Sequence, residues 1–85
     1  MPKSVFTDAY RLLIEDLVAA RRAKKVSQAE LASRLAKVKS FIAKVERRGR
    51  RLDVLEFCAV SRALGYDESE LLARVVARLP RELEI

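Results

Sequence analysis

Positively charged side chains are concentrated between positions 27 and 51 of this 85-residue chain. That segment carries eight lysines and arginines against two acids, Glu30 and Glu46, whereas residues 52–85 carry four cations and seven acids. A local excess of cations is suited to a polyanion such as nucleic acid. A solvated protein surface would show the same run of charge, so the elements that carry the cations must decide between the two interpretations.

No other set of side chains in the sequence is suited to chemistry. The chain has no histidine and a single cysteine, Cys58, so neither a His/Cys metal cluster nor an intramolecular disulfide can form. It also lacks a glycine-rich phosphate loop and a nucleophile–base pair, and its acid pairs lie at helix starts, where capping explains them. The sequence therefore argues against an enzyme and predicts no cofactor. Cys58 is expected to be a small core residue.

The composition predicts a soluble, all-α protein. Charged residues make up 35% of the chain and hydrophobic residues 51%, which is typical of a globular domain. Helix-forming residues dominate, and no alternating run of β-branched residues predicts a strand. We expect one domain over residues 1–85, with a core from about 5 to 79 and frayed ends at 1–4 and 80–85. No apolar run approaches about 18 residues and no signal peptide is evident, which predicts a cytoplasmic protein without a membrane partner.

Apolar periodicity and capping signals together predict five helices. The first is expected at Val5–Lys24, and a capping box of Ser27 and Glu30 opens a short second helix that ends at Leu35. Capping patterns at two further aspartates predict the last two helices, one ending near Leu64-Gly65 and the other at Leu79, before Pro80. These helices begin after Asp53 and Asp67.

The third predicted helix, at about Val38–Arg48, divides into two faces, and Gly49 is expected to end it in the left-handed conformation. One face is apolar and the other is cationic, small and hydroxyl-bearing, which suits the major groove of DNA. The apolar face comprises Val38, Phe41, Ile42 and Val45, and the opposite face comprises Lys39, Ser40, Ala43, Lys44 and Arg47.

The segment that begins at Gln28 runs Q-A-E-L-A-S-R-L-A-K-V-K-S-F-I-A-K-V-E-R. It resembles the helix-turn-helix of the Cro/phage-repressor-like (XRE) family, which includes phage repressors and restriction–modification controller proteins, and the likeness extends over about residues 11–79. The resemblance implies a compact five-helix, lambda-repressor-like domain whose second and third helices form the helix-turn-helix. Family members commonly have Gly where this chain has Ala36, so either Ala36 has a positive φ or the turn differs.

The resemblance also implies roles for individual positions. Arg21 and Glu46 match an arginine and a glutamate that often form a structural salt bridge, although Arg21 could contact DNA instead. Residues that match base-contacting positions are Lys39, Ser40, Ala43 and Lys44. Residues at or near phosphate-binding positions are Ser27, Gln28, Lys37, Arg47, Arg48, Arg50 and Arg51.

The sequence therefore predicts a prokaryotic or phage transcriptional regulator, such as a repressor, that binds double-stranded DNA. A single recognition helix covers few base pairs, so we expect a homodimer on a palindromic operator. Residues of the fifth helix and the turn before it are expected to make the dimer contact: Tyr66, Leu72, Val75, Val76 and Leu79. The alternative is an antitoxin or anti-activator whose partner is a protein (polymerase, a toxin or an activator). RNA binding is disfavoured because aromatic stacking platforms are missing.

Overall fold

The computed structural model describes residues 7–84, and that range contains five α-helices and no strand. The all-α, five-helix prediction is confirmed. The helices are α1 (Asp8–Ala23), α2 (Gln28–Arg34), α3 (Lys39–Glu46), α4 (Val54–Ala63) and α5 (Glu68–Arg78). None of these helices combines the length and the apolar character that crossing a membrane would demand.

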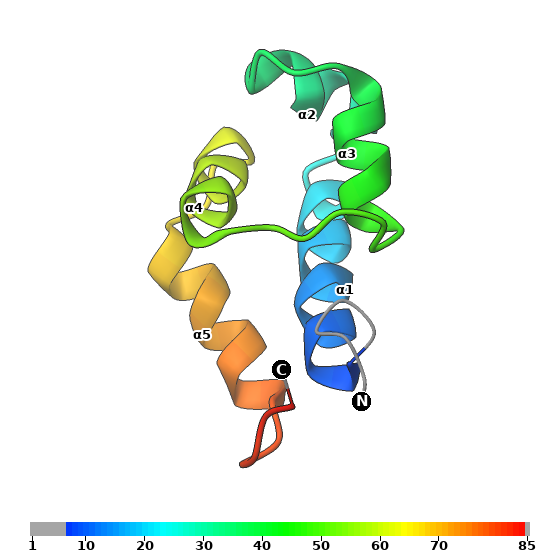
Figure 1. Cartoon of the computed structure of the whole chain (residues 1–85). Helices are drawn as coiled ribbons and strands as arrows, with labels where there is room; N and C mark the ends of the chain where they lie inside the picture. Colours follow the sequence, from blue (N-terminus) through cyan, green and yellow to red (C-terminus); the bar gives the residue numbers. More distant parts are fainter. Residues whose placement is uncertain (1–6, 85) are drawn as a thin grey trace.

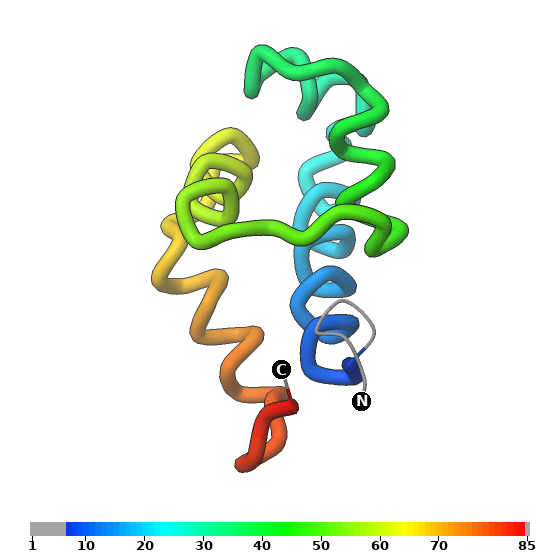
Figure 2. The backbone as a smooth tube through the Cα atoms, in the orientation of Figure 1, coloured from blue at the N-terminus to red at the C-terminus, as the bar shows by residue number. Residues whose placement is uncertain are grey.

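Helices α2 and α3 form one end of the molecule, and the first turn of α1 and the last turn of α5 lie at the opposite end (Figure 1). Helix α2 packs mainly against α3, while α1 contacts both α3 and α5. The segment that joins α3 to α4 crosses from the α1 side of the molecule to the α4 side (Figure 2). Helix α3 is therefore held mainly by α2 and by α1.

One cluster of apolar side chains lies between the helices. It includes Ile14 and Leu17 from α1, Ile42 and Val45 from α3, and Val60 from α4, all of them buried. Burying such side chains is the main favourable contribution to folding a domain of this size. Cys58, predicted in the core, is only half-buried and lies outside this cluster.

Four of the five helices begin at a side chain that accepts a backbone hydrogen bond. Thr7 caps α1 through the N–H of Tyr10, so α1 begins three residues later than predicted; Val5 and Phe6 lie outside the described residues. Asp53 forms the full predicted capping box at α4. The other two predicted boxes are incomplete. Ser27 accepts from the N–H of Glu30, but the Glu30 carboxylate pairs with Arg34, and Asp67 accepts from the N–H of Ser69.

Four helices end in a left-handed residue followed by a chain reversal. The N–H two residues after each C-cap bonds back to a carbonyl of the last turn, as in Lys37 to Ala32 at 2.8 Å. The left-handed residues are Lys25, Ala36, Arg48 and Gly65. The sequence assigned this conformation to Gly49 after α3, which was wrong. Because α3 ends two residues earlier than predicted, at Glu46, Arg48 takes that position with a φ of 61°.

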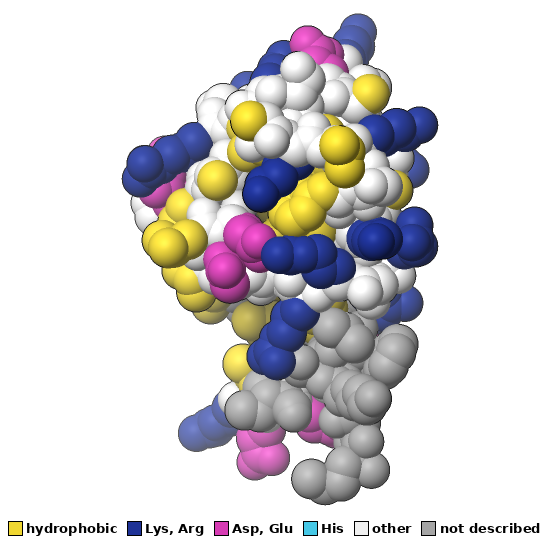
Figure 3. Space-filling view, turned by 45° about the horizontal axis from the view of Figure 1, so that its top comes forward, with side chains coloured by type: hydrophobic (Ala, Val, Ile, Leu, Met, Phe, Trp, Pro, Cys, Tyr) yellow, Lys and Arg dark blue, Asp and Glu magenta, His cyan; other side chains and the backbone are white. Residues whose placement is uncertain are grey.

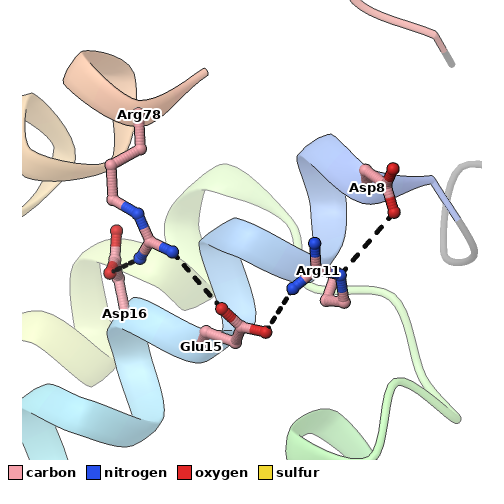
Figure 4. Close-up of polar contacts among 5 residues, drawn as sticks. All are labelled: Asp8, Arg11, Glu15, Asp16 and Arg78. Carbon is pink, nitrogen blue, oxygen red and sulfur yellow. Dashed lines mark hydrogen bonds and ion pairs between the residues drawn. The ribbon is translucent and has the colours of Figure 1, made fainter. Parts of the chain in front are cut away.

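A chain of ion pairs ties the end of α5 to α1 (Figure 4). The Arg78 guanidinium contacts Asp16 and reaches Glu15 at 3.3 Å, and Glu15 also accepts from Arg11 at 2.5 Å. The hydrogen bond from Arg11 lowers the pKa of the Glu15 carboxyl. Asp16 is mostly buried, whereas Arg11, Glu15 and Arg78 are substantially exposed. The exposed pairs each contribute little alone, but together the ion pairs fix the terminal helix on α1.

Ala36 and Gly65 provide a matched test of the left-handed turns. The left-handed conformation costs an L-residue about 1–2 kcal/mol. Replacing that residue with Gly removes the strain, but the greater entropy of Gly in the unfolded state offsets part of the gain in stability. We expect Ala36→Gly to stabilise the protein by about 0.5–1 kcal/mol, because the exposed methyl of Ala36 contributes no core packing. Gly65→Ala should destabilise it by about 1 kcal/mol, because Gly65 has a φ of 83°, whereas the new Cβ would meet only Lys24 Nζ at an ordinary contact distance of 3.6 Å. Thermal unfolding measures both, and destabilisation by Ala36→Gly would contradict the assignment.

Candidate nucleic-acid interface

A buried ion pair lies where α1, α2 and α3 meet. Arg21, near the end of α1, donates through Nε and Nη2 to the two carboxylate oxygens of Glu46, at 2.6 and 2.9 Å. The remaining terminal nitrogen of Arg21 donates to the carbonyl of Val26 at 2.9 Å. Gln28, the first residue of α2, donates from Nε2 to Glu46 at 2.9 Å. The two charged side chains are only 10% and 13% exposed, so this network sets the position of α3 relative to the start of α2.

This geometry satisfies Arg21 within the protein. All three of its guanidinium nitrogens donate within the protein, and its charge is balanced by Glu46. A buried pair of this kind is costly to break, at about 3–5 kcal/mol when one partner is removed. The structural bridge is therefore the role that fits Arg21.

Ion pairing leaves an uncompensated group of cations around α3. Every ion pair found among residues 7–84 uses an arginine, and both acids of the basic segment, Glu30 and Glu46, are paired. Six cations of that segment make no ion pair with any described residue; we call them the free cations. They are Lys37, Lys39, Lys44, Arg47, Arg48 and Arg51. In Figure 3, lysine and arginine side chains are spread over the face in which the α2–α3 end comes forward.

The exposed side of α3 carries the side chains predicted to contact bases. Lys39, Ser40 and Lys44 are exposed and Ala43 is half-buried, whereas Ile42 and Val45 on the opposite side are buried. Residues three and four apart share a face of a helix, so the exposed set forms one surface. Its donors match the acceptors that guanine presents in the major groove, which is wide enough to admit a helix.

Arg50 differs from the free cations because its charge is already balanced. Its guanidinium donates to both carboxylate oxygens of Glu56, at 2.9 and 2.7 Å, and lies 4.7 Å from the ring centroid of Phe41. Lys37 approaches the same ring at 5.6 Å. Arg50 therefore clamps the start of α4 to α3, and its charge is already balanced by Glu56 before any phosphate approaches.

Comparison with known proteins identifies relatives among solved structures. An XRE-family like protein from Pseudomonas syringae pv. tomato str. DC3000 is 42% identical and superposes with a TM-score of 0.80, over 85% of this chain and 88% of that chain. The chain belongs to the XRE family. No protein-family model and no curated protein matches it.

The clp gene regulator ClgR from Corynebacterium glutamicum matches this XRE chain in two solved structures, with TM-scores of 0.73 and 0.75 at 21% and 20% identity. Those matches cover 84% and 89% of this chain and 76% and 99% of the ClgR chains. At such identities the similarity concerns the fold alone. The sequence prediction of an XRE-type, five-helix domain is confirmed.

Two residues of the predicted phosphate-binding set are held by internal bonds in this XRE domain. The Ser27 hydroxyl accepts from the N–H of Glu30 at 3.0 Å, which leaves its own hydrogen available. One amide hydrogen of Gln28 donates to Glu46, which leaves the second hydrogen and the backbone N–H at the start of α2. Both residues could therefore still donate to a phosphate.

Val38 was predicted in the apolar stripe of α3, and this prediction was wrong. Val38 is the N-cap of α3, has an extended backbone with a ψ of 155°, and is 70% exposed. Helical periodicity places a residue on a face only once the helix has begun, and this helix begins at Lys39. The start of α3 is unmarked in the sequence, because the position before Lys39 holds none of the usual capping residues Ser, Thr, Asp or Asn.

The residues predicted to make the dimer contact differ in how exposed they are. Val75 is buried inside the domain and cannot face a partner, and Leu79 is half-buried. Tyr66 is also half-buried, with Lys24 and Arg74 at 4.7 and 5.5 Å from its ring centroid. Leu72 and Val76 are exposed. The spacing of apolar residues along α5 predicted a wide apolar side, but it could not show how much of that side α1 and α4 would cover.

The Arg50–Glu56 clamp makes a pH-dependent contribution to stability. The hydrogen bond from Arg50, followed by the backbone N–H of Asp53, lowers the pKa of Glu56 below its ordinary value. A carboxyl whose pKa is lower in the folded state stabilises the fold above its unfolded pKa of about 4.3 and loses that effect as the pH falls through the folded value. We expect Glu56→Gln to be less stable than wild type at pH 7 and to approach it near pH 3. Thermal unfolding across that range measures the difference, and a constant difference would contradict the assignment.

Proposed function

We propose that this protein is a cytoplasmic, sequence-specific transcriptional regulator that binds duplex DNA as a homodimer on a palindromic operator. The observation that carries the proposal is the group of free cations on and beside the exposed face of α3, the second helix of an XRE-type helix-turn-helix. Such a surface combines attraction to phosphates with side chains able to contact bases. We infer no catalytic role for the protein.

Three regions would contact the DNA in different ways. Lys39, Ser40, Ala43 and Lys44 would contact base edges in the major groove. The start of α2, with Ser27 and Gln28, would donate to one phosphate through backbone and side chain. The remaining phosphate contacts are assigned to Lys37, Arg47, Arg48 and Arg51, with Arg50 acting mainly through Glu56.

An exposed apolar face supports association with a second copy. We define the apolar face as Val54 and Leu55 at the start of α4 together with Leu72 and Val76 on α5; these side chains are 77%, 79%, 45% and 56% exposed. A hollow of about 160 Å³ lies between Val54 and Leu72, with Leu13, Leu52 and Phe57 in its lining. Patches of this kind on a small domain mark sites of association.

Symmetry favours a second copy of the chain as the occupant. A two-fold axis would place the apolar faces of two copies against each other, so that each copy presents the same residues to its partner. The charges at the two ends of α5 are largely balanced within the chain, since Glu68 pairs with Arg62 and Arg78 pairs with Glu15 and Asp16, so apolar contacts would hold the two copies together. Pairing would also supply the second recognition helix that a palindromic operator needs.

The first experiment is selection from random duplex DNA at about 0.15 M salt, where phosphate attraction alone is weak. We expect an enriched palindrome whose half-sites lie about 34 Å apart, one helical turn. On that operator, Lys44→Ala should cost about 1–3 kcal/mol of binding and relax the preference at one position.

Arg51→Ala is the matched control for Lys44→Ala. It should weaken binding to all sequences alike and reduce the salt slope by about one, because Arg51 is assigned to a phosphate. An unchanged base preference in Lys44→Ala would contradict the assigned recognition face. If no sequence is enriched, the primary partner would instead be another protein.

The dimer is tested separately by its mass in solution. Sedimentation equilibrium should give twice the chain mass of 9.7 kDa for the wild type. The double variant Leu72→Ser/Val76→Ser should raise the dimer dissociation constant at least about tenfold, because each copy loses two apolar contacts. Val38→Ser removes a valine on the α3 side that is more exposed than Leu72 or Val76, and it should leave the mass unchanged. A monomeric wild type at high concentration would overturn the dimer.

A further inference from the structure

Val38 is the exception among the residues that begin helices in this protein. The N-caps of α1, α2, α4 and α5 are Thr7, Ser27, Asp53 and Asp67, and each side chain accepts a backbone hydrogen bond from its first turn. Val38 is the N-cap of α3 and makes no such bond, since its side chain has no polar atom. Its side chain is also 70% exposed.

Neither property of Val38 benefits the fold. An uncapped start destabilises a helix relative to Ser, Thr or Asp at the same place, and α3 has only eight residues over which to recover the loss. An apolar side chain left in water contributes no burial. Threonine has almost the same shape as valine and would supply the missing acceptor, so sterics do not explain the valine. A contact outside the chain would account for both properties.

The neighbours of Val38 indicate what that contact is. Lys39 and Ser40 follow it directly, and both are exposed at the same end of α3. If the proposed function is correct, this end of the helix faces base edges. Those edges present polar atoms throughout the major groove except at thymine, whose C5 methyl is the one apolar group. Polar side chains can select the other positions, whereas a branched apolar side chain is suited to the methyl.

We propose that Val38 is a specificity-determining residue that packs against the C5 methyl of one thymine in each half-site of the operator. The inference rests on the proposed DNA-binding function and adds a base preference to it. The loss of helix stability at this position is then offset by discrimination in binding.

The test uses the selected operator with each thymine replaced in turn by uracil, which lacks only the methyl. Wild-type affinity should fall about three- to fivefold at one thymine per half-site, the effect of losing one buried methyl. Val38→Ser should bind the thymine operator more weakly by a similar factor and be insensitive to uracil there. Its midpoint of thermal unfolding should nevertheless rise by about 4 °C or more, because serine caps α3.

Val38→Thr is the matched control, since it supplies the same cap and keeps one methyl. It should share the higher unfolding temperature and retain the response to uracil. If Val38→Thr loses that response as Val38→Ser does, the altered helix start is responsible and the proposal is overturned. It is also overturned if no uracil substitution weakens the wild type. Absence of any preferred operator would overturn the DNA-binding function together with this role, whereas operator binding without methyl dependence would overturn only the role of Val38.

Discussion

The buried pair of Arg21 and Glu46 is the interaction on which the arrangement of the helix-turn-helix depends. It joins the end of α1 to the end of α3, and Gln28 brings the start of α2 into the same network. Burial of two charges is tolerated because each makes several hydrogen bonds. Since Gln28 and α3 are held by one carboxylate, the predicted phosphate contact and the predicted base-contacting face keep a fixed separation, as recognition of a regular duplex requires.

The short helices depend on this tertiary frame for their stability. Helices α2 and α3 have seven and eight residues, too few to persist in water alone. Their tight, left-handed ends at Ala36 and Arg48 are strained for L-residues, and packing of the core has to outweigh that strain. The strained turns in return reverse the chain within a few residues, so that α3 can lie against α2 while one of its sides stays open.

The pairing of charges shapes the electrostatic field more than the net charge of +6 does. Arginines bind the acids, including Glu30, Glu46 and Glu56, and leave the free cations concentrated on and beside α3. These free cations attract a polyanion to their side of the molecule and raise its rate of encounter. The apolar face on α4 and α5 carries none of the free cations, so contact with DNA and contact with a second copy are assigned to different surfaces.

Much of this architecture follows from the sequence alone, because capping residues and apolar periodicity are local signals. They specify five helices, and the segment from Gln28 to Arg47 indicates the family. The tertiary structure decided the features that local signals do not specify, namely where each helix starts and stops, which side chains are buried and which charges pair. It exposed Val38, gave the left-handed position to Arg48 rather than Gly49, buried Val75 and paired Arg50 with Glu56. Periodicity gives an angle around a helix axis, whereas exposure and charge pairing depend on where each helix begins and on what packs against it.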